Sequence, residues 1–359
     1  MTSPGNLDQP ASDTQTNNPI QQRLMEFIRE ELSPSNGNYS VRKLLGDASS
    51  RQYFRYVSTD GESFIMAAYP EPFSPDHFSY LEVYEILRLI DVPVPEILKI
   101  DGRLGIVFQE DLGDESLQGL LAETPPNMRK ILLENAVDMI IRIQEKGTEE
   151  FKPEHEGYAL AFDEEKLVWE FNFFRKHYLG NYRGAGQPDS EGIDREFQAI
   201  AGELANLPRV LCHRDYHVRN IMVKNGIQYL IDFQDARWGP LVYDLASLLK
   251  DSLSLDDETI RSVLDYYRQE ISKCSLPRFE GGIPDNEAFL RQFHLMSVQR
   301  LLKALGTYGY QVVVRGNFIY EQYMKGSLDR ALHSVRALGE FPMIEEMVER
   351  ELNHKLEND

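Results

Sequence analysis

The stretch from Leu211 to Asp251 constrains this chain more than any other. It holds two aspartates, Asp215 and Asp232, with Asn220 between them, and short apolar runs flank these polar residues. A Lys-Asn-Gly turn at 224–226 separates two of the apolar runs, which predicts two strands joined by a tight hairpin. We therefore expect the three polar side chains to gather at one edge of the hairpin.

This set of side chains matches the needs of one kind of chemistry. A carboxylate can take a proton from a hydroxyl group, and carboxylate and amide oxygens are ligands that Mg²⁺ accepts. Phosphoryl transfer requires such a base and such oxygen ligands. A lone Asp-x4-Asn is as often a solvated turn, but three elements in order, each at a strand end, favour a site. Asp215 is thus a candidate base, and Asn220 and Asp232 are candidate Mg²⁺ ligands.

The acidic balance of the chain limits its partners. Its 359 residues include 38 basic and 58 acidic side chains, for a net charge of −20. A nucleic acid or an anionic membrane would repel such a molecule overall. The two cysteines provide no disulfide framework and fit a reducing, cytoplasmic setting. Residues 1–19 are polar, so we expect a disordered tail and not a signal peptide or membrane span. No oligomeric state follows from these features.

Strand patterns dominate the N-terminal third, and helical patterns dominate the rest. The runs that predict strands are residues 40–45, 51–58, 62–69, 96–100 and 104–109. Helical spacing of apolar side chains is found after residue 116. It includes a helix over residues 164–178 that Asp163 caps and a final helical run over residues 326–350. We expect an α+β protein in which residues 20–112 form a small lobe with an antiparallel sheet, and residues 113–359 form a mostly helical lobe.

The order of the motifs resembles a known family. His213-Arg214-Asp215 and Asn220 have the spacing of the protein-kinase catalytic loop, and Asp-Phe-Gln at 232–234 stands where kinases carry Asp-Phe-Gly. Asp-Tyr-His at 215–217 and Tyr-Asp-Leu-Ala at 243–246 are more similar to the aminoglycoside phosphotransferase family of small-molecule kinases. The resemblance implies a bilobal protein-kinase-like fold with an N-lobe that binds the nucleotide, a catalytic C-lobe, and ATP and Mg²⁺ as cofactors.

The resemblance also assigns positions around the phosphates. The loop between the first two strands covers the phosphates in kinase-like proteins, which implies contacts from Ser49 and Ser50. The family carries a phosphate-binding lysine in the third strand and pairs it with a glutamate of the following helix, where Glu82 and Glu85 are present, yet residues 63–68 contain no lysine. Candidate replacements for this positive charge are Arg51, Arg55 and Lys43. Arg219, within the catalytic loop, is a further candidate for a phosphate contact.

The remaining assignments concern the hinge and the acceptor. Glu110 and Leu112 occupy the expected hinge between lobes, where backbone groups bind the adenine edge in the family. Asp244 resembles the family's buried carboxylate that holds the catalytic loop. Glu170 and Arg300 are assigned to the substrate. A carboxylate among aromatic residues, as at Glu170, suits a sugar or an amine, although dense aromatics are also typical of a core.

Several motifs are closer to one branch of the family. They are Gly46-Asp47-Ala48-Ser49, Gln109-Glu110-Asp111-Leu112-Gly113, Asp232-Phe233-Gln234-Asp235-Ala236 and the run from Val298 to Gly306. They are similar to bacterial kinases that phosphorylate N-acetylmuramate and N-acetylglucosamine at C1 during cell-wall recycling, and that also lack the third-strand lysine. Two alternatives stay open. One is a kinase of another small alcohol or amine (aminoglycoside, choline, homoserine), and the other is a nucleotide-binding pseudokinase regulator.

Overall fold

The computed structural model describes residues 19–32, 39–44, 51–184, 190–251, 253, 255–276 and 282–354. Ser49 and Ser50 lie outside these ranges, as do residues 1–18 of the predicted tail. The chain divides into two units by its internal contacts. The first unit groups Met1–Pro75 with Glu96–Asp111, and the second groups Asp76–Pro95 with Leu112–Asp359.

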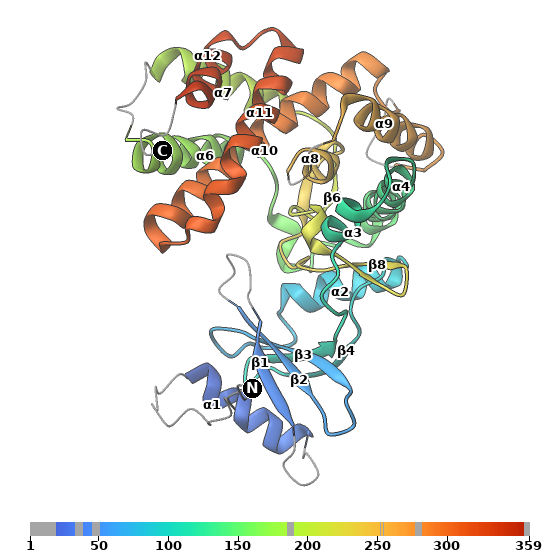
Figure 1. The fold of residues 1–359 in the computed structure, drawn as a ribbon. Helices are drawn as coiled ribbons and strands as arrows, with labels where there is room; N and C mark the ends of the chain where they lie inside the picture. Colours follow the sequence, from blue (N-terminus) through green and yellow to red (C-terminus); the bar gives the residue numbers. More distant parts are fainter. Residues whose placement is uncertain are drawn as a thin grey trace, which may run out of the picture. The chain divides into compact units, whose positions relative to one another are not determined.

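A five-stranded antiparallel sheet forms the centre of the first unit (Figure 1). In sheet order the strands are β1 (Ser40–Lys43), β2 (Gln52–Val57), β3 (Ser63–Ala68), β5 (Ile106–Glu110) and β4 (Ile97–Asp101). All five strands agree with the sequence prediction, with small differences at their ends. The agreement is expected because alternating side chains on a half-buried sheet leave a strong period-two signal.

Helix α1 (Pro19–Phe27) continues into a π-helical turn at Ile28–Leu32 and packs on this sheet. The Phe27 ring lies 5.9 Å from the ring of Phe108 on β5. Leu24 and Ile28 are buried in the same cluster as residues of β2, β3 and β5. The apolar face of the helix thus covers one face of the sheet and completes the core of the first unit.

The second unit is mostly helical (Figure 1). Its longer helices are α2 (Ser79–Leu89), α3 (Leu117–Glu123), α4 (Pro126–Arg142), α6 (Glu164–Phe174), α7 (Ser190–Ala205), α8 (Tyr243–Lys250), α9 (Asp257–Ile271), α10 (Asn286–Arg315), α11 (Glu321–Leu338) and α12 (Pro342–Asn353). A three-residue helix α5 (Thr148–Glu150) and short π-helical and 3-10 turns connect several of them. The mostly helical character predicted for this part of the chain is confirmed.

Helix α2 groups with the second unit, although the sequence led us to place it in the N-terminal lobe. The Tyr80 ring stacks on the Phe233 ring with centroids 4.7 Å apart. The Leu230 amide donates to the Pro93 carbonyl at 2.8 Å, and Arg142 donates to the Asp91 carbonyl at 2.7 Å. These contacts join segments far apart in sequence, which spacing along the chain cannot reveal.

Caps explain where several helices of the second unit begin and end. Asp163 accepts a hydrogen bond from the Lys166 amide at 2.8 Å, as expected for the start of α6. Gly316 and Gly339 have φ of +68° and end α10 and α11. The final helical run predicted at residues 326–350 is therefore two helices, because Gly339 stops the first and Pro342 starts the second.

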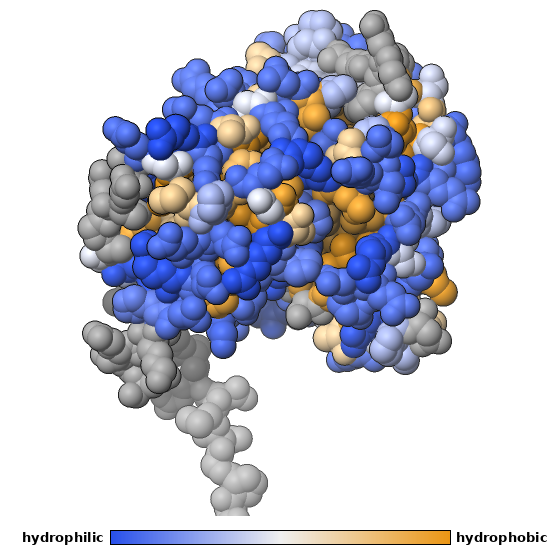
Figure 2. All heavy atoms as spheres, turned by 90° about the horizontal axis from the view of Figure 1, so that it is seen from above, coloured by the Kyte–Doolittle hydropathy of each residue, from blue (hydrophilic) through white to orange (hydrophobic). Residues whose placement is uncertain are grey.

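Among the described residues, none of the helices has the length and apolar character needed to cross a membrane. The face shown in Figure 2 carries mainly hydrophilic residues, with apolar residues in smaller patches. Cys212 and Cys274 are both free thiols.

Candidate active site

Two small antiparallel sheets place the catalytic segment in the second unit. The predicted hairpin is confirmed as β7 (Ile221–Lys224) and β8 (Ile227–Leu230), and Asn225 and Gly226 at its turn have φ of +54° and +77°. Strand β6 (Arg209–Cys212) pairs with β9 (Arg237–Pro240), a strand that the sequence did not predict. The run Arg-Trp-Gly-Pro has no alternating pattern, and its partner lies more than 20 residues earlier in the chain.

These strands bring together the three candidate residues of the catalytic segment. Asp215 follows β6, Asn220 directly precedes β7 and Asp232 follows β8. The Asn220 side-chain amide donates to the Asp215 carbonyl at 2.9 Å, and the Ile231 amide donates to the Asn220 carbonyl at 3.0 Å. Asn220 therefore links the loop that carries Asp215 to the strand end that carries Asp232.

The backbone of this loop has two residues in the left-handed region, Arg214 with φ +86° and Asp232 with φ +65°. Residues other than glycine rarely adopt this backbone conformation. It costs about 1–3 kcal/mol at each position and persists only when neighbouring groups hold it. The buried Asp244 carboxylate provides such a hold, since it accepts hydrogen bonds from the His213 amide at 2.7 Å and the Arg214 amide at 3.1 Å. This contact matches the role that the resemblance implied for Asp244.

Burial sets the protonation of the groups that support the loop. It raises the pKa of Asp244 to about 7, against the opposite effect of its two backbone hydrogen bonds. Burial also lowers the pKa of His213 to about 4, so its imidazole is neutral. The His213 Nε2 lies 3.1 Å from the Ile231 carbonyl and joins the loop to the residue before Asp232.

Three cations surround the Asp215 carboxylate. Lys303 Nζ lies 3.7 Å, Arg214 Nη1 3.8 Å and Arg300 Nη2 4.0 Å from its oxygens. Burial acts to raise the pKa of Asp215, but the charges of Lys303, Arg214 and Arg300 outweigh it and hold the pKa well below its usual range. Asp215 is therefore ionised, which is the state needed to accept a hydrogen bond from a hydroxyl group.

Arg300, predicted to contact the substrate, is almost fully buried at 4% exposure. Its guanidinium donates to the Arg214 carbonyl at 2.7 Å and to Asp251 at 3.2 Å, and it lies 4.8 Å above the Tyr243 ring. These contacts tie α10 to the catalytic loop and to the end of α8. They favour a positioning role, and a direct contact between Arg300 and the substrate stays a prediction.

Glu170, the other residue assigned to the substrate, lies on α6 and is only 1% exposed. Gln299 on α10 donates to its Oε2 at 2.7 Å, and the Lys166 ammonium lies 3.9 Å from its Oε1. This Oε1 has no hydrogen-bond partner among the described residues. A buried carboxylate oxygen of this kind has unused capacity to accept a hydrogen bond from a ligand hydroxyl or amide.

Gln299 and Lys303, which the sequence did not lead us to expect, lie one turn apart on the same helix as Arg300. Positions i and i+4 share a helix face. The signal that would have identified them is their spacing around the predicted Arg300. Their partners, Glu170 and Asp215, lie 129 and 88 residues away in the chain, so only the tertiary structure reveals the contacts.

The nucleotide positions predicted from the resemblance lie in both units. In the first unit, the Arg51 guanidinium lies 5.8 Å from the Tyr53 ring centre, and Glu110 ends β5. In the second unit, Leu112 is buried, and the Arg219 guanidinium lies 5.3 Å above the Tyr323 ring. Contacts between these residues and a nucleotide stay predictions.

One candidate replacement for the lysine that β3 lacks already has a partner in the fold. Arg55 on β2 forms an ion pair with Asp111, at 2.6 Å from its Nε, and the Ser63 hydroxyl also donates to Asp111. Both charged side chains are nearly buried, at 11% and 6% exposure. Arg55 therefore has a structural partner within its own unit. Glu82 on α2, which together with Glu85 was a candidate partner for such a lysine, accepts a hydrogen bond from the Glu156 amide at 2.8 Å.

We expect Arg55→Met to lower the free energy of unfolding by about 3 kcal/mol, because the buried Asp111 would lose its cation. Urea denaturation followed by circular dichroism measures this change. As the matched control, Arg55→Met combined with Asp111→Leu should recover most of the loss. A loss below about 1 kcal/mol in the single variant, typical of an exposed pair, would contradict this expectation.

The Mg²⁺ that the family implies fits the residues at the end of the hairpin. The Asn220 amide nitrogen is engaged by the Asp215 carbonyl, which leaves the side-chain oxygen as its metal-binding atom. The Gln234 amide lies 3.2 Å from an oxygen of Asp232 and 3.4 Å from one of Asp235. The described residues contain no cluster of three or more Asp, Glu, His or Cys that could hold a metal. One carboxylate and one amide are appropriate for an ion that keeps waters and binds nucleotide phosphates.

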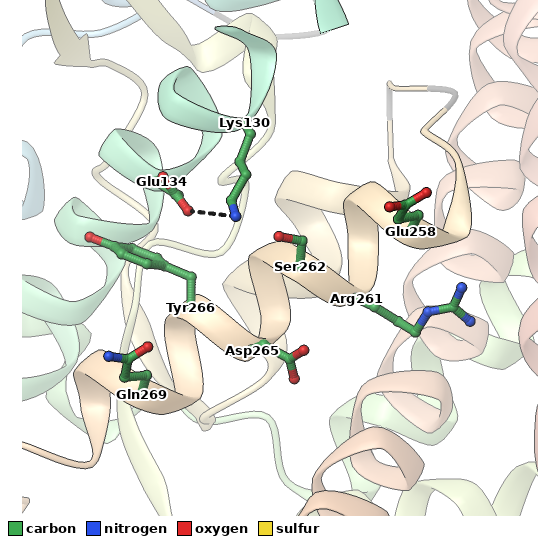
Figure 3. Close-up of a pocket in the computed structure, with 8 residues that line it drawn as sticks. All are labelled: Lys130, Glu134, Glu258, Arg261, Ser262, Asp265, Tyr266 and Gln269. Carbon is green, nitrogen blue, oxygen red and sulfur yellow. Dashed lines mark ion pairs between the residues drawn. The ribbon is translucent and has the colours of Figure 1, made fainter. Parts of the chain in front are cut away.

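Two surface cavities are lined by residues other than Asp215, Asn220 and Asp232. One, of about 410 Å³, lies between α4 and α9 (Figure 3), where Lys130 pairs with Glu134 at 3.6 Å. The other, of about 260 Å³, is lined by residues of α6 and α7 and by Arg175. The candidate site therefore rests on the contacts around Asp215, Asn220 and Asp232.

Comparisons with known proteins identify the family of this chain. Residues 40–276 match the model of the phosphotransferase enzyme family APH. A Neisseria meningitidis N-acetylmuramate/N-acetylglucosamine kinase is 31% identical over 268 residues, which cover 73% of this chain and 75% of that protein. A Pseudomonas aeruginosa kinase of the same name is 32% identical over 266 residues, with 73% and 74% coverage.

Solved structures show the same fold at lower identity. A choline/ethanolamine kinase family protein from Mesorhizobium loti has a TM-score of 0.58 and 14% identity, and the match covers 93% of this chain and 100% of that one. An ADP-bound aminoglycoside phosphotransferase has a TM-score of 0.54 and 14% identity, with 86% and 96% coverage. This chain belongs to the phosphotransferase enzyme family, with its kinase-like α+β fold, and is an enzyme that transfers phosphate to a hydroxyl group.

Proposed function

We propose that this enzyme transfers the γ-phosphate of ATP to the anomeric C1 hydroxyl of an N-acetylated amino sugar of the N-acetylmuramate or N-acetylglucosamine type. The ionised Asp215 among three cations, at the end of β6, carries the proposal of phosphoryl transfer. The names of relatives at 31% and 32% identity support the choice of acceptor. The free thiols fit a cytoplasmic location.

Asp215 acts as the base in this proposal. Its carboxylate accepts a hydrogen bond from the acceptor hydroxyl and takes the proton as the new bond to phosphorus forms. A carboxylate of low pKa is a weak base, and an anomeric hydroxyl is more acidic than an ordinary alcohol. The low pKa of Asp215 thus suits an anomeric acceptor better than a simple alcohol.

The other residues bind the two substrates. Asn220 and Asp232 would hold Mg²⁺, which neutralises phosphate charge when it is bound. On the acceptor side, the Oε1 of Glu170 is suited to accept a hydrogen bond from a sugar hydroxyl or acetamido group. Arg300 positions the loop that carries Asp215. The proposed nucleotide contacts come from Ser49, Ser50, Arg51, Glu110, Leu112 and Arg219.

Incubation with ATP, Mg²⁺ and a panel of acceptors tests the proposal. N-acetylmuramate and N-acetylglucosamine should give ADP and a sugar 1-phosphate, which ³¹P NMR distinguishes from a 6-phosphate. ADP release only with choline, homoserine or an aminoglycoside would replace this acceptor class. Nucleotide binding without turnover of any acceptor would favour a regulator, which the absence of lysine in β3 would then explain.

We expect Glu170→Gln to raise the KM for the sugar by about tenfold, because a hydrogen bond to a charged oxygen becomes one to a neutral amide. The KM for ATP should stay unchanged. Steady-state kinetics measure both constants, and Glu165→Gln, an exposed position on the same helix, is the control. Equal changes in both KM values would show that Glu170 supports the fold and does not bind the sugar.

A further inference from the structure

Lys303 lies on the face of α10 that contacts the catalytic loop. The Lys303 ammonium is 3.7 Å from Asp215 Oδ1, and Arg300, one turn earlier, donates to the carbonyl of Arg214. Helix α10 is held in this position by Gln299, which donates to Glu170 on α6. The first hydrogen bond ties the backbone that carries Lys303 to the loop of Asp215, and the second ties the same helix to α6.

Lys303 has fewer ion-pair partners than the other two cations beside Asp215. Arg214 pairs with Asp235 at 2.7 Å, and Arg300 pairs with Asp251 at 3.2 Å. In the part of the chain that the structure describes, Asp215 is the one group within ion-pair or hydrogen-bond distance of the Lys303 ammonium. Its side chain is 20% exposed, whereas that of Arg300 is 5% exposed. Lys303 can therefore turn toward an incoming anion without leaving a buried carboxylate unpaired.

The reaction brings an anion to this position. The acceptor oxygen attacks the γ-phosphorus while its proton passes to Asp215, and the bond from the γ-phosphorus to the bridging oxygen of ADP breaks. The acceptor oxygen must lie within hydrogen-bond distance of Asp215. The phosphoryl group that this oxygen attacks therefore lies next to the Asp215 carboxylate. A lysine 3.7 Å from the same carboxylate has the length to reach the phosphoryl oxygens. The chain has a net charge of −20 and no lysine in β3, so a local positive charge at this point offsets the repulsion between the protein and the phosphoryl group.

We infer that Lys303 is a second catalytic residue, which binds the transferred phosphoryl group through its ammonium as that group moves from ATP to the acceptor. Asp215 alone accepts the proton of the hydroxyl. The interaction is strongest when the phosphoryl group is between donor and acceptor, so its contribution appears in kcat more than in either KM. This inference rests on the function proposed above.

Kinetics of Lys303→Met and Lys303→Arg test the inference. We expect Lys303→Met to lower kcat by about 100-fold, the typical loss for one preorganised donor at a transition state. The KM for N-acetylglucosamine should change by less than about threefold. Lys303→Arg keeps the charge and should recover part of kcat. Lys325→Met, an exposed lysine on α11, is the control and should keep wild-type kinetics.

Product binding gives a measurement that does not depend on turnover. Calorimetry without nucleotide measures the affinity for the sugar and for its product. Lys303→Met should weaken the binding of N-acetylglucosamine 1-phosphate by about tenfold or more and leave the binding of N-acetylglucosamine unchanged. Equal weakening of both would show that Lys303 only positions the loop and would overturn the inference. A kcat within about threefold of wild type would also overturn it.

Failure of the proposed acceptor is distinguishable from failure of this inference. If the wild type phosphorylates neither amino sugar, the proposed function fails before any variant is compared. The slow transfer of phosphate from ATP to water needs no sugar and is then measured on the same proteins. A large loss of this hydrolysis rate in Lys303→Met, with partial recovery in Lys303→Arg, supports the contact between Lys303 and the phosphoryl group. Equal rates in the wild type and both variants overturn it.

Discussion

Asp215→Asn is expected to lower kcat by about 10²- to 10⁴-fold, the range contributed by a general base. The asparagine has nearly the same shape but cannot accept the hydroxyl proton. The Asn220 hydrogen bond goes to the backbone carbonyl of residue 215, so the substitution leaves that link intact. Arg214 and Arg300 also keep their partners Asp235 and Asp251. The loss should therefore arise from the chemical step and not from unfolding.

The affinity for ATP with Mg²⁺ should stay close to that of the wild type in this variant, because Asp215 faces the acceptor in the proposed mechanism. Kinetics under saturating ATP and nucleotide titration by calorimetry measure the two quantities separately. Asp265→Asn, on α9 outside the candidate site, is the control. Near-normal turnover in Asp215→Asn would show that another group takes the proton, and the assignment of the base would be wrong.

The second large effect concerns Asp232→Ala. This change removes the one carboxylate proposed to hold Mg²⁺, and we expect the affinity for ATP in the presence of Mg²⁺ to fall by at least about 100-fold. Affinity measured with EDTA and no divalent ion should change little, because the proposed role of Asp232 acts through the metal. Turnover should be lost in parallel, since Mg²⁺ neutralises phosphate charge in the reaction.

Calorimetric titration with ATP, in Mg²⁺ and in EDTA, separates a metal ligand from a structural residue. Asp232 has φ of +65°, so Asp232→Asn, which tolerates this conformation, is the matched variant that keeps the backbone. It should lose most of the Mg²⁺-dependent affinity while unfolding at nearly the wild-type temperature. An equal loss of affinity with and without Mg²⁺ would contradict the proposed ligand role.

Features that depend on neighbouring residues could be predicted well from the sequence. The Asn225-Gly226 turn allowed the hairpin to be located, because positive φ at both positions is what a two-residue turn requires. Asp163 marked the start of α6 because a cap acts within one helical turn. The five strands of the first unit were visible as alternating runs. In each case the physical interaction spans a few residues, so the pattern is written in contiguous sequence.

Features that depend on distant residues could not be predicted in this way. The pairing of β6 with β9 joins Cys212 to Arg237, and the contacts between α2 and Phe233 cross about 150 residues. Arg300 was recognised as part of a motif, but its burial and its bond to the Arg214 carbonyl were not foreseen. A side chain that packs against a remote segment carries no local signal of its partner.

The sequence by itself determined the catalytic segment: the order and spacing of Asp215, Asn220 and Asp232, and the hairpin that gathers them. Only the tertiary structure decided the charge around Asp215, because Arg300 and Lys303, which lie 85 and 88 residues later in the chain, reach it from α10. The physical reason is that hydrogen bonds within a turn follow from local chemistry, whereas electrostatic fields depend on which distant side chains the fold brings within about 4 Å.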